Sequence, residues 1–212
     1  MKLLEYKARL IELIAKSGVL MFGDFTTKSG RQSPYFVNTG FYMTGEQADL
    51  VGTYYAAFIN EKLQGKFDVL FGPSYKGIPL CTLTAAALSR LYKINAGYCF
   101  NRKEEKDHGE GGIFVGWQPQ DGDRFLIIED VISAGTSVRE VYPLLIKAAN
   151  VSVTDMVISV DRMEHGYSGL TATEEIKNEF ESYIKERPYK SFLPLDAKPP
   201  LELNKELMDK FR

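Results

Sequence analysis

Two acidic residues followed by a run of small residues form the stretch of this sequence best suited to chemistry. Glu129 and Asp130 follow the apolar run 125–128, and residues 133–137 read Ser-Ala-Gly-Thr-Ser. A loop of small residues can turn several backbone N–H groups towards one anion, and a helix that begins after the loop adds its positive end. Two carboxylates beside such a loop suit a ligand that carries both a phosphate and hydroxyl groups. A phosphorylated sugar has these properties.

A purely structural interpretation of the same residues also exists. Acidic residues are common at strand ends, and Ser or Thr before a helix is an ordinary N-cap. The order of the parts (strand, acidic pair, glycine-containing hydroxyl loop, helix) favours the phosphate site. The stretch has neither the Gly-Lys-Ser/Thr of a Walker loop nor the G-x-G-x-x-G pattern of dinucleotide sites.

Three polar segments supply positive charge. Residues 72–77 place Lys76 between two glycines, which is either an anion site or a plain turn with a solvated lysine. Residues 101–112 carry three basic residues and a histidine among four acids. A solvated hairpin tip is the usual interpretation, whereas the glycines near its end suit a hinged lid that brings Lys106 and His108 to a departing phosphate. The third segment is the basic turn 27–31.

Two further side chains are candidates for binding a flat, acidic ring. Phe36 can stack on such a ring, although a phenylalanine of this type is more often part of the core. Arg162 follows the predicted strand 155–160 and can form a two-pronged pair with a carboxylate or an imide edge. Its structural alternative is a surface ion pair with Asp161.

Helices and strands alternate along the chain and must position these residues. We expect helices at residues 3 to about 17, 47–63, 77–91, 136–149, 171–186 and 203–211, and strands at 19–26, 34–38, 67–72, 96–100, 113–115, 125–128 and 155–160. This alternation predicts an α/β fold with a mostly parallel sheet flanked by helices. Ligands of such sheets bind beyond the carboxyl ends of the strands, which we expect at Gly72, Phe100, Glu129 and Val160.

The bulk properties are those of an ordinary globular chain. Its 212 residues suit one domain, with residues 1–45 and about 163–212 contributing a cap on the sheet. A net charge of -2 gives no general attraction to nucleic acid or to an anionic membrane, so we expect neither as a partner. Two cysteines and two histidines do not favour a disulfide scaffold or a zinc centre. No run is as long as a membrane span, and the cytoplasm is the expected location.

Five segments, taken in order, resemble the orotate phosphoribosyltransferase family, one of the type I phosphoribosyltransferases. The segments are residues 25–36, 71–79, 98–112, 129–137 and 159–162. The motif at 129–137 resembles the ribose-phosphate motif of the whole type I class. The loop with Lys106 and His108 and the Lys-Ser-Gly-Arg turn at 28–31 are specific to the orotate family.

This resemblance implies a type I phosphoribosyltransferase fold and a reaction of de novo pyrimidine (UMP) biosynthesis. Ribose 5-phosphate would pass from phosphoribosyl diphosphate to orotate, giving orotidine 5'-monophosphate and diphosphate. Mg²⁺ would be held mainly by the diphosphate, the ribose hydroxyls and water, without a dedicated set of protein ligands. The chain would act as a homodimer in which loop 101–112 reaches the site of the partner.

The resemblance also implies roles for individual residues. Catalytic roles would fall to Lys106, His108, Glu129 and Asp130. Phosphoribosyl diphosphate would be bound by Lys28, Tyr75, Lys76, Arg102, Lys103, Lys106, His108, Glu129, Asp130, Val131, Ile132, Ser133, Ala134, Gly135, Thr136 and Ser137. Orotate would be bound by Phe36, the backbone of Val37, Ser133 and Arg162.

The sequence departs from the family pattern at several positions. Glu129 stands where the family usually has aspartate, and one extra methylene changes its reach to the sugar hydroxyls. Ser133 replaces a usual threonine and Val37 a frequent phenylalanine. After Arg162 the likeness fades, because residues 189–200 are interrupted by prolines where the family usually has a further strand and helix.

Two other functions are alternatives to this one. The first is a phosphoribosyltransferase for a purine or another pyrimidine, against which the orotate-type loop 101–112 argues. The second is a non-catalytic sensor of phosphoribosyl diphosphate that regulates transcription or attenuation. Such a sensor would keep the motif at 129–137, lose the lid chemistry and carry a basic face for nucleic acid.

Overall fold

The computed structural model describes residues 3–26, 30, 32–106, 112–165 and 168–186. The helices are α1 (Leu3–Lys16), α2 (Gly45–Lys62), α3 (Gly77–Ala87), α4 (Thr136–Ala148) and α5 (Ala172–Glu186). The strands are β1 (Leu20–Thr26), β2 (Gln32–Val37), β3 (Val69–Gly72), β4 (Gly97–Lys106), β5 (Gly112–Gly116), β6 (Arg124–Ile132) and β7 (Ser152–Asp161). A 3-10 turn, Thr39–Phe41, follows β2, and a π-helical turn, Leu88–Tyr92, follows α3.

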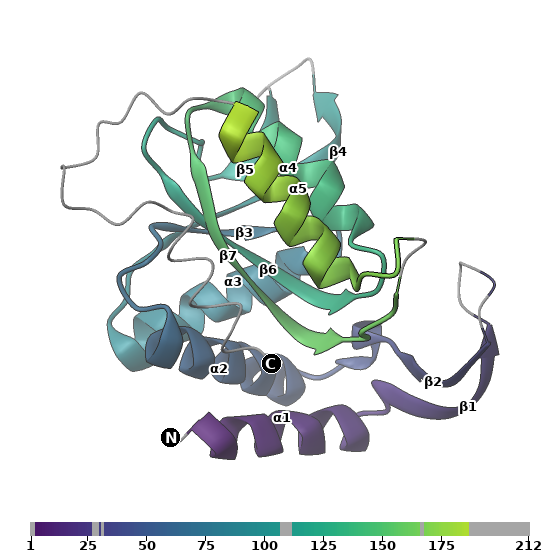
Figure 1. The fold of residues 1–212 in the computed structure, drawn as a ribbon. Helices are drawn as coiled ribbons and strands as arrows, with labels where there is room; N and C mark the ends of the chain where they lie inside the picture. The colour runs from purple at the N-terminus through teal and green to yellow at the C-terminus, as the bar shows by residue number, and fades with distance from the viewer. Residues whose placement is uncertain (1–2, 27–29, 31, 107–111, 166–167, 187–212) are drawn as a thin grey trace.

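Five strands form the central sheet in the order β5-β4-β3-β6-β7 (Figure 1). The pairs β3–β4, β3–β6 and β6–β7 are parallel, whereas β5 returns antiparallel to β4. The predicted α/β fold with a mostly parallel sheet is therefore confirmed. Because parallel strands end on the same edge, the carboxyl ends of β3, β6 and β7 lie together, and the loops that follow them share that edge.

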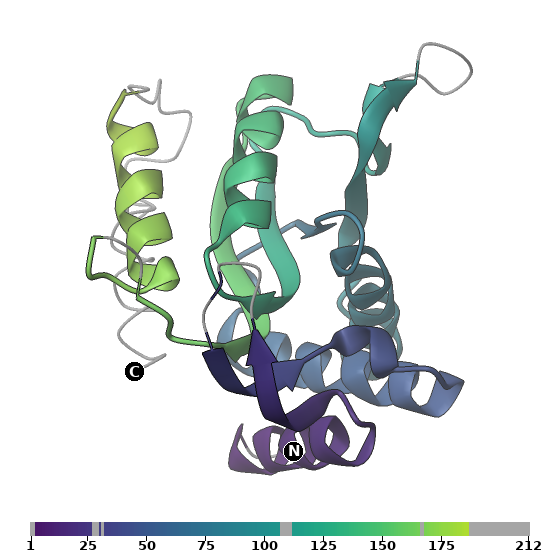
Figure 2. The ribbon, with the colours of Figure 1, turned by 90° about the vertical axis from the view of Figure 1, so that its right-hand side faces the viewer.

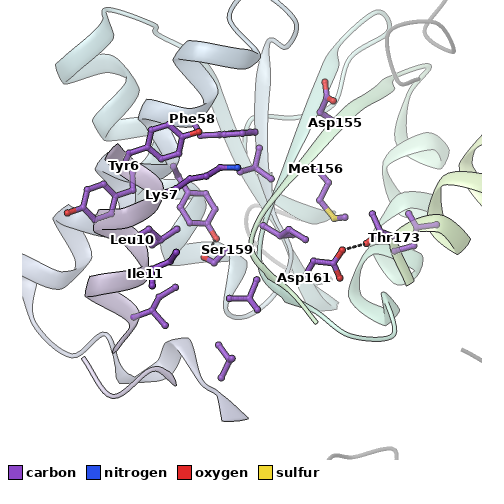
Figure 3. Close-up of a pocket in the computed structure, with 18 of the residues that line it drawn as sticks. Tyr6, Lys7, Leu10, Ile11, Phe58, Asp155, Met156, Ser159, Asp161 and Thr173 are labelled. Atoms are coloured by element: carbon purple, nitrogen blue, oxygen red, sulfur yellow. Dashed lines mark hydrogen bonds between the residues drawn. The ribbon is translucent and has the colours of Figure 1, made fainter. Parts of the chain in front are cut away.

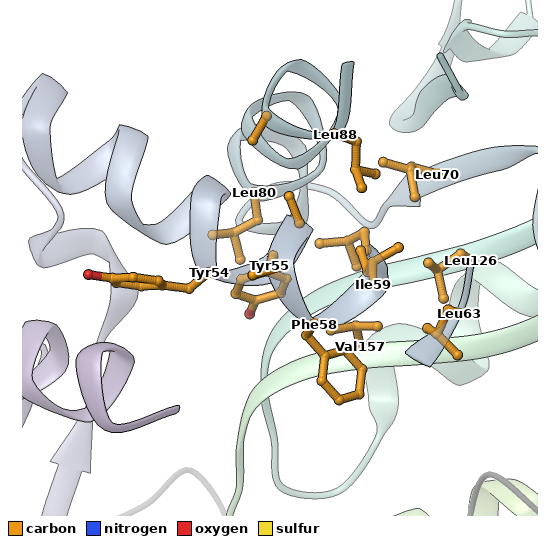
Figure 4. Close-up of a cluster of buried hydrophobic side chains, with 14 of the residues drawn as sticks. Tyr54, Tyr55, Phe58, Ile59, Leu63, Leu70, Leu80, Leu88, Leu126 and Val157 are labelled. Carbon is orange, nitrogen blue, oxygen red and sulfur yellow. The ribbon is translucent and has the colours of Figure 1, made fainter. Parts of the chain in front are cut away.

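The two faces of the sheet are covered by different helices. In β6, Leu126 and Ile128 point into a cluster with buried side chains of α2 and α3 (Figure 4). Phe125 and Ile127 point to the opposite face, where they pack against buried residues of α4 and α5. Successive residues of a strand alternate between faces, so a strand buried on both sides reads as a continuous apolar run. Figure 2 shows the resulting layers, with α5 on the side away from α1 and α2.

The first part of the chain packs against the edge of this sheet at which β6 and β7 end. Strands β1 and β2 form an antiparallel pair, and α1 lies beside α2 (Figure 1). Ile14, Val19 and Val37 form a small buried cluster that also includes Val131 and Val160 near the ends of β6 and β7. This contact brings the residues after β2 close to the acidic pair.

Two strands continue well past their predicted ends. Strand β4 continues to Lys106, through residues assigned to a loop, because its backbone pairs with β5 as far as the Lys106–Gly112 register pair. Strand β6 continues to Ile132, because it pairs with β7 as far as the pair Ile132–Asp161. Glu129 and Asp130 therefore lie inside a strand, not after it. The predicted helix at 203–211 falls outside the described residues.

The helix predicted at 77–91 also differs in form from its prediction. The regular α-helix ends at Ala87, and the last turn is π-helical. Within the described part of the chain, no helix combines the length and apolarity needed to cross a membrane.

Candidate active site

Glu129 supports the small-residue loop from inside strand β6. Its side chain is only 6% exposed. The hydroxyl of Ser137 donates to Oε2 at 2.7 Å, and the backbone N–H of Asp130 donates to Oε1 at 3.0 Å. Both carboxylate oxygens therefore have a donor, and one of these donors belongs to the first turn of α4. Glu129 fixes the distance between the strand and the start of the helix.

Asp130 points towards the other side of the strand, where three donors meet it. The hydroxyl of Thr39 donates to Oδ2 at 2.6 Å, and Nζ of Lys76 lies 3.6 Å from the same oxygen. The backbone N–H of Val131 donates to Oδ1 at 2.7 Å. Asp130 thus links β6, the turn after β2 and the turn after β3.

The electrostatics of this pair follow from burial. Burial raises the pKa of the Glu129 carboxyl above its ordinary value, and the donors Ser137 and Asp130 N–H act in the opposite direction. Burial also raises the pKa of Tyr42 to about 12, and the charge of Asp130 adds to that rise. The negative field of the pair therefore extends into the first segment of the chain.

The loop after β6 is shaped by Gly135. This residue has φ +70°, in the left-handed region, and a Cβ there would lie 2.3 Å from Cδ1 of Ile176 in α5. Gly135 is buried, whereas Ser133, Ala134 and Thr136 are exposed. The loop is thus pressed against α5 on one side and turns its exposed residues outward beside the N-terminus of α4, where an anion is favoured.

Arg139 ties this loop to α5, a role that no sequence pattern predicts. Its guanidinium donates to the backbone oxygen of Ala134 and, through Nε, to Glu179 at 2.7 Å. Its Nη2 donates to Glu175 at 3.0 Å. Sequence reasoning missed this residue because its acidic partners are 36 and 40 residues away.

The turn after β3 lies against the start of the charged segment in β4. The backbone N–H of Ser74 donates to the side chain of Asn101 at 3.1 Å, and Nζ of Lys103 lies 5.1 Å from the ring centroid of Tyr75. Nη1 of Arg102 donates to the backbone oxygen of Gly112 at 3.0 Å. The structure therefore brings two of the three predicted basic segments together.

The candidate ring-binding residues lie on β2 and at the end of β7. Phe36 is 37% exposed and stacks on Phe25 with 5.6 Å between ring centroids, so it is not a core residue. Val37 is 8% exposed and buries its side chain, leaving only its backbone for a ligand.

Arg162 pairs with a partner that the sequence did not predict. Its Nε donates to Glu164 at 2.6 Å, and its Nη2 donates to the hydroxyl of Ser33 at 3.1 Å. The guanidinium also lies 4.8 Å from the ring centroid of Tyr35. The predicted alternative, an ion pair with Asp161, is wrong.

Three predicted site residues lie outside this description. Lys28 and His108 are not among the described residues, and only the backbone of Lys106 is described, at the end of β4. Their predicted roles stay predictions.

A groove of about 560 Å³ is lined by residues of α1, α2, β7 and α5 and by Val37 of β2 (Figure 3). Its lining is mostly apolar, with Leu10, Ile11 and Phe58 on the helices and Met156 on the strand. It contains neither member of the acidic pair nor Lys76. A phosphorylated ligand needs the donors at the sheet edge, so this groove is not the candidate active site.

Comparison with known proteins agrees with this arrangement. Residues 45–171, more than half of the chain, match the family described as the phosphoribosyl transferase domain. The acidic pair, the small-residue loop and the mostly parallel sheet are thus those of a phosphoribosyltransferase.

Individual proteins that are similar to this chain over most of its length are orotate phosphoribosyltransferases. The orotate phosphoribosyltransferase of Clostridium acetobutylicum is 51% identical over 176 residues, covering 83% of this chain and 79% of that protein. That of Lachnoclostridium phytofermentans is 52% identical, with 83% and 78% covered. The crystal structure of the Francisella tularensis orotate phosphoribosyltransferase is 35% identical, with a TM-score of 0.71 over 95% of this chain and 98% of that one. The chain belongs to the orotate phosphoribosyltransferase family.

This membership confirms the predicted function and enzyme class. The chain is a glycosyltransferase-type enzyme of pyrimidine biosynthesis. The type I phosphoribosyltransferase fold predicted from the resemblance is confirmed as well.

Proposed function

We propose that the transfer of ribose 5-phosphate from phosphoribosyl diphosphate to orotate takes place at the carboxyl ends of β3, β6 and β7. The observation that carries this assignment is the buried acidic pair. Glu129 supports the loop that precedes α4, and Asp130 faces Lys76 with 3.6 Å between Oδ2 and Nζ. A carboxylate and an ammonium group so close together suit a ligand whose two halves develop opposite charges.

The small-residue loop would bind the 5'-phosphate. The exposed residues Ser133, Ala134 and Thr136 stand where backbone N–H groups and hydroxyls can meet an anion. Val131 and Ile132 complete the approach from β6, and Gly135 supplies the sharp turn. Glu129 acts through Ser137, because the hydrogen bond between them fixes the first turn of α4 relative to β6.

The acidic pair and the basic residues would divide the charge that develops as the anomeric bond breaks. Positive charge grows on the ribose ring, where Asp130 and Glu129 stabilise it, and negative charge grows on the diphosphate. Lys76 lies beside Asp130. Arg102 and Lys103 lie on β4, and Asn101 of that strand contacts Ser74 in the turn that contains Lys76. Lys28, Tyr75, Lys106 and His108 are proposed for the diphosphate side as well. No nucleophilic side chain is needed.

Orotate would lie between β2 and the end of β7. The exposed ring of Phe36 offers a stacking face, and the Val37 backbone and Ser133 can add polar contacts. Arg162 can bind the orotate carboxylate in a two-pronged manner if its pairing with Glu164 opens.

Mg²⁺ is proposed as the cofactor, held without a dedicated set of protein ligands. Among the described residues there is no cluster of three or more His, Cys, Asp or Glu side chains that could hold a metal. Mg²⁺ typically keeps several waters and takes substrate phosphate oxygens, so the diphosphate, the ribose hydroxyls and water would be its main ligands. When bound, the metal would neutralise charge on the diphosphate.

We further propose a cytoplasmic homodimer. In it, loop 101–112 would close over the site of the partner and exclude water, which would otherwise hydrolyse the cationic sugar. Phosphoribosyl diphosphate is highly charged and does not cross membranes unaided, which supports the location.

The test is the loss of orotate ultraviolet absorbance with Mg²⁺ and phosphoribosyl diphosphate. Lys106→Ala should lower turnover by on the order of 10²–10³ with the fold intact, and Lys62→Ala on the surface of α2 serves as its control. Mixing the Lys106→Ala and Asp130→Asn variants should restore part of the activity if the loop crosses between subunits. Turnover of a purine base but not of orotate by the wild-type chain would overturn the assignment.

A further inference from the structure

The turn that follows β2 makes direct contacts with two charged residues of the site. Asn38 precedes the 3-10 turn Thr39–Phe41 and caps it, because its Oδ1 accepts the backbone N–H of Gly40 at 3.1 Å. The backbone N–H of Asn38 donates to Val19 at 2.8 Å. The turn is therefore fixed in place by its own bonds as well as by the residue that precedes β1.

Thr39 is a buried residue whose hydroxyl donates a hydrogen bond to Asp130. The residue is 8% exposed, and Oγ1 donates to Oδ2 of Asp130 at 2.6 Å across 91 residues of sequence. A hydrogen bond to the carboxylate of a residue that is itself only 6% exposed is strong, because little water competes with it.

Asn38 contacts the opposite charge. Nζ of Lys76 donates to Oδ1 of Asn38 at 3.3 Å, while the same Nζ lies 3.6 Å from Oδ2 of Asp130. Two successive residues of the turn thus meet the anion and the cation of the site, one each. The lysine is the more exposed of the two, with 53% of its side chain accessible against 9% for Asp130. The lysine can move when a ligand binds, whereas the aspartate is held.

We propose that Thr39 is a positioning residue that fixes the Asp130 carboxylate for the ribose ring, with Asn38 guiding Lys76 between Asp130 and the diphosphate. This inference rests on the proposed role of Asp130. A carboxylate with Oδ1 bound to the Val131 N–H and Oδ2 bound to Thr39 cannot rotate about its last side-chain bond without losing both bonds. The orientation of Oδ2, and with it the direction from which a ligand can approach this oxygen, is therefore fixed.

The consequence is a prediction about rate as opposed to affinity. Positive charge on the ribose is greatest in the transition state, so a misplaced Asp130 should cost more there than in substrate binding. In the proposed site orotate contacts other residues, Phe36 and Arg162, so its binding should not depend on Thr39.

Thr39→Val keeps the shape of the side chain and removes only the hydroxyl. We expect kcat to fall about tenfold to a hundredfold while KM for orotate changes less than about twofold. Thr39→Ser, which keeps the hydroxyl, should recover most of the rate. If Thr39→Val does not fold, Thr39→Ala carries the same test, because its side chain fits within the volume of threonine.

The matched control is Thr84→Val on α3. Thr84 is also a buried threonine, but its hydroxyl has no hydrogen-bond partner within the part of the chain that the structure describes. The same substitution there should leave both kcat and KM unchanged. Equal rate losses in the two variants would mean that loss of a buried hydroxyl acts through general stability, and the inference would fail.

A double-mutant comparison separates this inference from the proposed function. In the Asp130→Asn background, Thr39→Val should lower the residual rate no further if Thr39 acts through Asp130. Additive losses would overturn the positioning role even in an active enzyme. If the wild-type chain does not consume orotate at all, the proposed function fails first, and that outcome is visible before any variant is compared.

Discussion

Replacing Gly135 by alanine tests how the small-residue loop at 133–137 is held. The residue has φ +70°, and an added Cβ would lie 2.3 Å from Cδ1 and 3.0 Å from Cγ1 of Ile176. Two costs therefore act together, backbone strain in the left-handed region and overlap with a packed side chain. Only the cost of the overlap with Ile176 depends on the contact between the loop and α5.

The two costs can be separated by a matched glycine. Gly65 has φ +76°, and nothing lies within 4 Å of an added Cβ. Gly65→Ala should therefore cost only the strain, roughly 1–2 kcal/mol. Gly135→Ala adds the cost of overpacking against Ile176, which is 4% exposed, and that term is typically about 1–3 kcal/mol. For a chain of this size the extra loss corresponds to roughly 2–12 °C in Tm.

The assay combines thermal unfolding with KM for phosphoribosyl diphosphate. Gly135→Ala should lower Tm more than Gly65→Ala and should also raise this KM, because the loop must move away from α5. Adding Ile176→Val removes Cδ1, the atom at 2.3 Å, and should recover part of both losses. Equal Tm values for the two alanine variants, or an unchanged KM for Gly135→Ala, would refute the reasoning.

The remaining predictions concern three carboxylates. Burial raises the pKa of Asp155 to about 7 from an ordinary 3.8, so the folded state loses stability as pH rises through that interval. Asp155→Asn should accordingly stabilise the fold by up to about 3 kcal/mol at pH 8 and by less at pH 5, measured by denaturant unfolding at both pH values. Glu129→Asp withdraws the carboxylate from the Ser137 hydroxyl and should raise KM for phosphoribosyl diphosphate about tenfold; an unchanged KM would contradict the supporting role of that bond. Glu164→Gln removes the charge that faces Arg162 and should lower KM for orotate, whereas a higher KM would show that Glu164 holds the arginine in its binding orientation.

The sheet was predictable because its apolar signal is strong and local. Residues 125–128 form a continuous apolar run, and such a run in a chain of alternating helices and strands fits few other folds. The acidic pair and the loop after it were found for the same reason, since their motif is contiguous. The extension of β4 to Lys106 was missed because its charged residues resemble a solvated tip, and only the pairing with β5 accounts for them.

The supporting contacts were not predictable, because their partners are distant in sequence. Thr39 and Asp130 are separated by 91 residues, and no local sequence pattern predicts that a threonine in a turn forms a hydrogen bond with a particular aspartate. Arg139 reads as an ordinary helix residue until α5 is placed beside it. Similarly, Arg162 was assigned to its chain neighbour, whereas its partners are Glu164 and the distant Ser33.

The ion pairs of Arg139 with Glu175 and Glu179 of α5 indicate how much of the chain the proposed sugar-phosphate site needs. The family match ends at residue 171, and every described residue that we assign to the ligand lies before that point. A fragment cut there would keep all of these residues but would lose Ile176, Glu175 and Glu179, the neighbours that hold the loop in shape. We therefore expect the smallest competent fragment to extend at least to Glu179, beyond the end of the family match.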